Sequence, residues 1–239
     1  MFNHTVPENW GIYPTIYGIP TYSIFIALSL AAAVIMYVYN SRNSESLRSD
    51  EAIKIVIAAF VGGIIGAKLP VVLLNLTQGW NGIETILAGR TIVGGMIGGL
   101  LSVILVKRHF KIKKRYGNVL APSVALAMAI GRIGCFLSGC CYGIPTNTAL
   151  GCDFGDGLLR YPTQLFEMTF CLISFVILQL TFRKMKPGQA LTLYFLGYFI
   201  FRVCIEFIRV NPMYMNLTVY QWISLAGIIF LLIKMKWVK

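Results

Sequence analysis

Acidic residues and histidines are scarce in this sequence. Its 239 residues include 9 Asp and Glu against 21 Lys and Arg, and the only two histidines are His4 and His109. Charged residues make up 13% of the chain and apolar residues 57%, and the mean hydropathy is +0.72. So little charge in so apolar a chain excludes an ordinary water-soluble domain and indicates an integral membrane protein.

Motifs for metal binding and for secretion are also missing. The six cysteines show no paired CxxC or Cys/His spacing, so the sequence predicts no metal site and no cofactor. No basic residue precedes the first apolar run, so we expect no cleavable signal peptide. Cys140, Cys141 and Cys152 gather around one loop, where free thiols, oxidised thiols and a disulfide from Cys152 to one of the other two all stay open.

Seven apolar segments of the chain predict the fold. We expect an all-α integral membrane protein with seven transmembrane helices, forming a single membrane domain over residues 1–239. The expected spans are 22–40, 55–76, 91–106, 116–136, 165–182, 190–208 and 219–232. The third span contains two overlapping GxxxG pairs, Gly94 with Gly98 and Gly95 with Gly99, which favour close packing against another helix.

Basic residues set the orientation. If the N-terminus lies outside, 15 of the 21 basic residues fall in cytoplasmic loops or at the cytoplasmic C-terminus. They are Arg42, Arg48, Lys54, Lys107, Arg108, Lys111, Lys113, Lys114, Arg115, Arg183, Lys184, Lys186, Lys234, Lys236 and Lys239. Anchoring at anionic lipid therefore explains most of the net charge of +12, and we expect no nucleic-acid partner.

The remaining basic residues lie within spans or toward the outer side: Lys68, Arg90, Arg132, Arg160, Arg202 and Arg209. An arginine at the centre of a bilayer helix costs roughly 2.5–3.5 kcal/mol, so it needs a partner. For Arg132 that partner is either a carboxylate in a structural ion pair between helices or a bound anion. Because arginine binds phosphate bidentately, a phospholipid headgroup is the most available anion.

Two stretches concentrate this polar chemistry. Residues 131–143, GRIGCFLSGCCYG, contain Arg132 at the end of an apolar run, together with small residues that let a backbone or ligand come close. In the sixth span, Arg202, Glu206 and Arg209 fall at i, i+4 and i+7, so a helix would place them on one face. Together with Arg132, this stripe predicts an anion-binding cavity that opens toward the outer leaflet.

Three motifs resemble, in this order, those of the prolipoprotein diacylglyceryl transferases: GRIGCFLSGCCYG, YPTQLFE and LGYFIFRVCIEFIR. Members of that family are membrane enzymes that move diacylglyceryl from phosphatidylglycerol to the lipobox cysteine of a prolipoprotein. The resemblance extends from Tyr22 to the last span. It implies a multi-pass enzyme of the bacterial cell membrane, with phosphatidylglycerol, a lipobox-bearing prolipoprotein and the lipid bilayer as its partners.

The resemblance also implies roles for individual residues. Arg132 and Arg202 match the two essential arginines, Tyr22 a tyrosine of the first span, and Gly143 the glycine that closes the first motif. As a set, the implied catalytic residues are Arg132, Arg202 and Tyr22. The implied substrate-binding residues are Arg132, Arg202, Glu206, Arg209, Gly143, Gln164, Glu167, Cys135 and Cys140.

The sequence departs from the family pattern at three positions. Cys135 replaces the usual asparagine, Cys140 stands where a glutamate is often found, and Val93 occupies the place of the HGG histidine. That histidine is a proposed base for the acceptor thiol, which must lose its proton to become a nucleophile. Since His4 and His109 lie in the N-terminal tail and the cytoplasmic basic run, Tyr22, Glu206, Cys140 or the positive field of the site would have to take over.

Three other functions stay open at this point. One is a related lipid transferase with a different acceptor. Another is an anion or lipid carrier that uses the same arginine-lined cavity, although the halves of the chain show no internal symmetry of the kind found in many carriers. The last is a structural membrane subunit.

Overall fold

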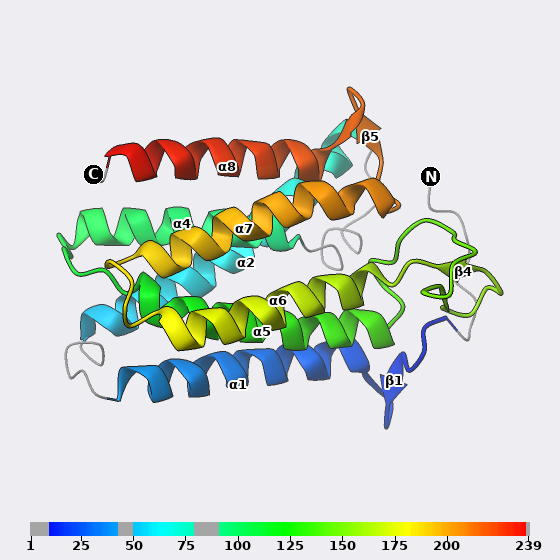
Figure 1. Cartoon of the computed structure of the whole chain (residues 1–239), viewed down its shortest axis with the longest axis horizontal. Helices are drawn as coiled ribbons and strands as arrows, with labels where there is room; N and C mark the ends of the chain where they lie inside the picture. The colour runs from blue at the N-terminus through cyan, green and yellow to red at the C-terminus, as the bar shows by residue number, and fades with distance from the viewer. Residues whose placement is uncertain (1–9, 43–49, 79–90, 238–239) are drawn as a thin grey trace. The chain divides into compact units, whose positions relative to one another are not determined.

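Seven long helices make up most of the computed structural model, which describes residues 10–42, 50–78 and 91–237. The helices of this described part are α1 (Thr21–Ser41), α2 (Asp50–Gln78), α4 (Ile92–His109), α5 (Gly117–Leu137), α6 (Thr163–Thr181), α7 (Gln189–Ile205) and α8 (Val219–Trp237) (Figure 1). Six of them are long and apolar enough to cross a membrane, and α8 contains a shorter apolar helix, Val219–Met235. The described chain is that of an all-α membrane protein.

Helix α2 starts earlier than the hydropathy predicts. It begins at Asp50, inside the polar stretch expected to be a loop, and it continues through Pro70. Asp50 and Glu51 occupy its first turn, where negative side chains interact favourably with the helix dipole. Asp50, Glu51 and Lys54, which were expected in a loop, therefore belong to the helix.

The expected helical stripe of Arg202, Glu206 and Arg209 is not formed. Helix α7 ends at Ile205, and Glu206–Ile208 form a 3-10 turn, η2. Arg209 then adopts an extended backbone conformation with φ −104° and ψ 151°. An extended residue turns its side chain away from the helical period, so the spacing i, i+4, i+7 does not hold across this segment.

Three antiparallel hairpins, each built from two strands of two residues, precede helices α1, α6 and α8. None of them was predicted from the sequence. They pair β1 (Thr15–Ile16) with β2 (Ile19–Pro20), β3 (Cys152–Asp153) with β4 (Leu159–Arg160), and β5 (Met213–Tyr214) with β6 (Leu217–Thr218). The loop of the last hairpin, Met215 and Asn216, has φ of 51° and 62°. Positive φ at both central residues is the conformation of a type I′ turn, whose twist suits a tight hairpin.

The chain divides into two compact units. The first consists of the described parts of Met1–Asn40, Gly117–Tyr194 and Cys204–Thr218. Within it α5 packs against α6, and α1 approaches α5 at Gly134, where an added Cβ would lie only 2.5 Å from Phe25 Cβ. Alanines spaced four apart on α5 are fully buried and keep the helices close. This unit carries most of the predicted site residues.

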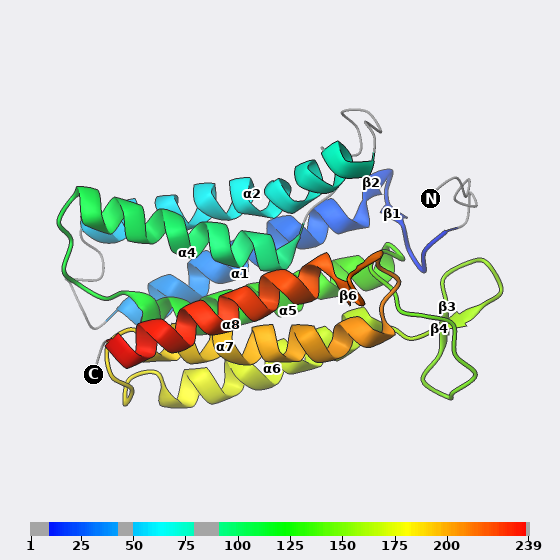
Figure 2. The same cartoon turned by 90° about the horizontal axis from the view of Figure 1, so that it is seen from above.

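The second unit consists of the described parts of Ser41–Tyr116, Phe195–Val203 and Val219–Lys239. Here α2 and α4 lie side by side (Figure 2). Gly94 and Gly98 of α4 face Gly66 of α2, and a Cβ on Gly66 would come within 2.7 Å of Gly98 Cα. The predicted close packing at these GxxxG pairs is confirmed, and the partner is a second glycine pair, Gly62 and Gly66.

Candidate active site

A buried ion pair joins α5 to α6. Arg132 lies near the end of α5, and its Nη2 is 2.6 Å from Glu167 Oε1 on α6. The side chains of Arg132 and Glu167 are 5% and 0% exposed. The carboxylate partner that the sequence allowed for Arg132 is thus present, and it is a residue that the family resemblance had assigned to substrate binding.

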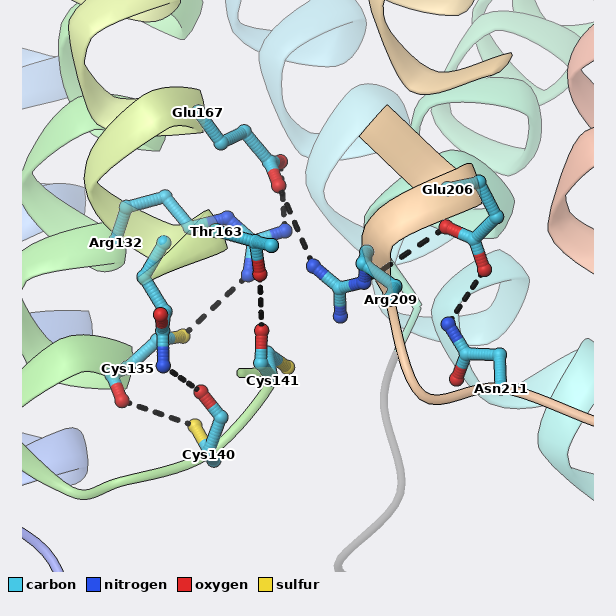
Figure 3. A network of polar contacts seen from close by, with 10 residues as sticks. Arg132, Cys135, Cys140, Cys141, Thr163, Glu167, Glu206, Arg209 and Asn211 are labelled. Atoms are coloured by element: carbon cyan, nitrogen blue, oxygen red, sulfur yellow. Dashed lines mark hydrogen bonds and ion pairs between the residues drawn. The ribbon is translucent and has the colours of Figure 1, made fainter. Parts of the chain in front are cut away.

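Glu167 also faces a second arginine. Its Oε2 is 3.8 Å from Arg209 Nη1, and Arg209 Nε is in turn 3.7 Å from Glu206 Oε2. Asn211 Nδ2 donates to the other oxygen of Glu206. Figure 3 shows this network of two arginines and two carboxylates beside the loop that follows α5. Glu206 and Arg209 thus form an ion pair within this network.

Gly143 positions the segment that carries Arg209. The two residues form an isolated antiparallel bridge, although 66 positions separate them in the sequence, and Ile144 N donates to Ile208 O at 2.9 Å. Gly143 N also donates to Tyr161 O at 2.8 Å. A Cβ on Gly143 would lie 2.5 Å from Ile208 O, so only glycine permits this approach. The glycine that closes the first motif therefore holds the third motif in place.

The loop after α5 brings three cysteines together, which the sequence analysis missed. The Sγ atoms of Cys135, Cys140 and Cys141 all lie within 4.8 Å of one another. Gly139 and Cys141, both with φ of 64°, turn the chain back so that Cys140 N donates to Cys135 O at 3.0 Å. No fixed spacing signals such a fold-back. A cluster of three thiols is a ligand set for a soft metal ion.

All six cysteines are free thiols, so the disulfide considered for Cys152 is not formed. Cys152 lies in β3, opposite Arg160 of β4, while Cys140 and Cys141 are grouped with Cys135. The fold-back after α5 directs the vicinal pair toward α5 instead of toward the hairpin.

The start of α6 fixes the cysteine loop. Gln164 Nε2 donates to Cys140 O, and Thr163 Oγ1 donates to Cys141 O, both at 2.6 Å. Gln164 is fully buried. Gln164, which was expected to bind substrate, thus holds the backbone that presents two of the thiols.

Hydrogen bonds among the thiols shift the pKa values of Cys140 and Cys141 in opposite directions. Hydrogen bonds from the Cys135 and Cys140 thiols, together with the positive charges of Arg209 and Arg132, lower the pKa of Cys141. The hydrogen bond of Cys140 with Cys135 raises the pKa of Cys140. Arg132 Nη1 also lies 3.7 Å from Cys135 Sγ. Of the two neighbouring thiols, Cys141 is thus the one whose pKa is lowered.

Tyr22 and Arg202, the two other predicted catalytic residues, belong to different units. Tyr22 lies at the start of α1. It approaches α5 at Gly134, two positions after Arg132, because a Cβ added to Gly134 would lie 3.6 Å from the Cα of Tyr22. Arg202 is a buried residue of α7 in the second unit, and its guanidinium carbon is 5.4 Å from the centre of the Tyr220 ring.

The remaining predicted cations and bases have separate surroundings. Arg160 pairs with Asp156 and stacks over Tyr142 in the segment between α5 and α6. Val93, at the position of the family histidine, is buried in α4. His109 ends α4, with its ring edge-on to Phe110, whereas His4 and Arg90 lie outside the described residues.

Apolar helices that surround a buried network of paired arginines and carboxylates define an integral membrane protein with a charged site, in which such groups are normally functional. The sequence profile of the family described as prolipoprotein diacylglyceryl transferase matches residues 12–237. The chain belongs to the prolipoprotein diacylglyceryl transferase family.

Curated relatives share this chain over most of its length. A phosphatidylglycerol–prolipoprotein diacylglyceryl transferase of Clostridium tetani is 35% identical over 228 residues, which cover 90% of each chain. Proteins of the same name from Dehalococcoides mccartyi and Streptococcus uberis are 32% and 31% identical, covering 80% and 87% of this chain and 77% and 89% of theirs.

Proposed function

We propose that this protein transfers diacylglyceryl from phosphatidylglycerol to the lipobox cysteine of a prolipoprotein. The observation that carries the proposal is the meeting of residues from all three family motifs in one unit: Arg132 and Gly143 from the first, Glu167 from the second, Glu206 and Arg209 from the third. The family match over residues 12–237 and the names of the relatives support it.

In this reaction the arginines bind the lipid phosphate. Arg209 suits that role, because its Nε and Nη1 are buried and make no hydrogen bond among the described residues, while their carboxylate partners lie at 3.7 and 3.8 Å. Such donors can bind phosphate oxygens without giving up a short bond. Arg132, which matches one of the family's two essential arginines, stabilises the charge that develops on the departing phosphate. Arg202 matches the other essential arginine, and we propose from that match that the reaction requires it too. Tyr22 lies beside the Arg132 turn and acts with them.

The chemical step is a displacement at carbon. The acceptor thiolate attacks the glyceryl carbon of the lipid, a C–S bond forms, and the C–O bond to the phosphate breaks. Glycerol phosphate leaves with the electron pair, and the peptide keeps the diacylglyceryl group as a thioether. Buried guanidinium groups accelerate such a step because they are already arranged around the leaving group.

The proposed topology is a single membrane domain with seven spans, an outer N-terminus and a cytoplasmic C-terminus, in the bacterial cell membrane. The distribution of basic residues supports this orientation. Helix α8 has 19 residues, within the range of about 17–25 residues that suffices for a span. Reagents that cannot cross the membrane should label a cysteine placed at Asp153 but not one placed at Lys111 or Lys236. Labelling of the cysteines at positions 111 and 153 from the same side of the membrane would refute the topology with seven spans.

Transfer is tested with purified protein in vesicles that contain phosphatidylglycerol and a synthetic lipobox peptide. Mass spectrometry should detect a thioether-linked diacylglyceryl group on the peptide cysteine. Vesicles of phosphatidylcholine alone and a peptide with serine for cysteine are the controls. Release of glycerol phosphate without modified peptide would indicate a different acceptor, and absence of both products would refute the transferase.

A further inference from the structure

The cysteine cluster is built like a ligand set. Its three sulfur atoms lie within 4.8 Å of one another, and exposure rises from Cys135, which is buried, through Cys140 to Cys141, which is exposed. Figure 3 shows the sulfur of Cys135 facing the guanidinium group of Arg132, with Cys140 and Cys141 on the adjoining loop.

The distances between the three sulfur atoms suit a metal ion that prefers thiolate ligands. Zinc–sulfur bonds of about 2.3 Å place the sulfurs of a tetrahedral site about 3.8 Å apart, so each pair needs to close by at most about 1 Å. Rotation of the side chains supplies that movement, because the peptide groups of Cys140 and Cys141 are held by Gln164 and Thr163. Thiolates select zinc or Cu(I) over harder ions.

We propose that Cys135, Cys140 and Cys141 bind one zinc ion and leave its fourth position open for the acceptor thiol. Three protein ligands with one open position are the pattern of catalytic zinc, whereas structural zinc sites are closed by four. The second part of this proposal, the binding of the acceptor thiol, rests on the proposed transferase function.

Zinc would solve the problem of the missing base. Val93 replaces the family histidine, and a thiol that coordinates zinc loses its proton outright. On binding, the acceptor S–H proton passes to water and the thiolate occupies the fourth position. The thiolate then attacks the glyceryl carbon and glycerol phosphate departs. The neutral thioether is a poor zinc ligand and leaves the position open again.

Charge and proximity support this placement. Zinc with three thiolates carries one negative charge, and the acceptor thiolate makes it two. Arg132, with Nη1 3.7 Å from Cys135 Sγ, lies beside this charge and offsets part of it. The same guanidinium is proposed to bind the lipid phosphate, so donor and acceptor would meet at one place, as a displacement reaction requires.

Metal binding is measured on the full chain purified in detergent, by elemental analysis and by the thiolate-to-cobalt charge-transfer absorption after cobalt substitution. The wild type should hold one zinc per chain. Cys135→Ser, Cys140→Ser and Cys141→Ser should each weaken zinc binding by more than about 100-fold. Loss of a residue that only supports a metal ligand weakens binding by up to about 100-fold, so a larger effect identifies a direct ligand. Cys171→Ser and Cys204→Ser should bind like the wild type. A wild type without zinc, with copper instead, or with a disulfide among the three cysteines would overturn the site.

The role of the metal is tested separately from the transferase activity. A lipobox peptide should shift the cobalt spectrum of the wild type, and the peptide with serine for cysteine should not. Removing zinc from the wild type with a chelator, without any substitution, should lower transfer at least tenfold, and zinc should restore it. If the spectrum shifts but no lipid is transferred, the proposed function fails while the zinc site stands. If the zinc-free protein transfers lipid at full rate, the catalytic role of zinc fails while the transferase stands.

Discussion

Arg132 Nη2 and Glu167 Oε1 lie 2.6 Å apart with both side chains buried, and Glu167 turns its other oxygen toward Arg209. One carboxylate thus sets the positions of two guanidinium groups that come from different motifs. A residue that orients the phosphate-binding arginines affects both the stability of the unit and the geometry of the site.

Glu167→Gln should therefore destabilise the protein strongly. Removing one partner of a buried ion pair costs about 3–5 kcal/mol, because the remaining charge stays buried without compensation. The double variant Arg132→Gln with Glu167→Gln should lose less than the sum of the two single changes. Thermal unfolding in detergent measures these differences. Asp156→Asn, which breaks the peripheral pair with Arg160, is the control and should cost much less. Equal losses in Glu167→Gln and Asp156→Asn would contradict the importance of the buried pair.

Gly143→Ala should abolish transfer, because its Cβ would be 2.5 Å from Ile208 O and would push the Arg209 segment away. Gly131→Ala in the same motif is the matched control, since its Cβ would meet only Ile26 Cδ1, at 4.0 Å. The lipid-transfer assay on equal amounts of purified protein compares the two. Full activity in Gly143→Ala would show that the bridge to Arg209 is dispensable.

The pair Gly66→Ala and Gly63→Ala tests the packing of α2 on α4. A Cβ on Gly66 would come within 2.7 Å of Gly98 Cα, whereas one on Gly63 would lie 3.7 Å from Gly95 O. We expect Gly66→Ala to lower the unfolding temperature and Gly63→Ala to leave it nearly unchanged. Overpacking of this kind typically costs about 1–3 kcal/mol. If both variants melt alike, the close approach is not needed for stability.

Much of this architecture could be predicted from the sequence. Hydropathy located the helices because burial in lipid demands long apolar segments, and the glycines of α4 indicated close packing because only small residues permit it. These are local properties. The extension of α2 to Asp50 was missed because charged residues at a helix start resemble a loop in a hydropathy reading.

The site was less predictable, since its contacts join distant segments. Nothing in the spacing shows that Glu167 lies against Arg132, or that Arg209 leaves the helix to pair with Gly143. The thiol cluster depends on two left-handed residues, Gly139 and Cys141, and a non-glycine residue with positive φ is rarely evident from sequence.

Cys152 should react slowly with alkylating reagents, yet completely without a reductant. Burial, and then the negative charge of Asp153, raise the pKa of Cys152, so less thiolate is present at a given pH than in a free cysteine. Below its pKa the rate should rise about tenfold per pH unit. Alkylation of a variant that keeps only Cys152, followed by mass spectrometry from pH 7 to 9, measures this. Incomplete reaction until a reductant is added to the wild type would instead show a disulfide.

Arg132→Lys and Arg202→Lys test whether the arginines act by geometry or by charge alone. A guanidinium binds two phosphate oxygens through a planar fork, whereas an ammonium is a point charge that does not fix the leaving group in line with the thiolate. Loss of one such contact should lower the rate about 10²–10³-fold. Arg132→Lys keeps a cation for Glu167, so membrane insertion and abundance should stay near normal.

The measurement is phosphatidylglycerol-dependent transfer per unit of purified protein. Arg160→Lys is the matched control, because Arg160 lies between α5 and α6, is paired with Asp156 and takes no part in the proposed reaction. Glu206→Gln should reduce the rate less than either lysine variant, since Glu206 orients Arg209 without contacting the lipid. If the arginines served only as structural ion-pair partners, the lysine variants would transfer at near wild-type rates and any damage would appear as lost abundance. Such an outcome would refute the bidentate role of both arginines.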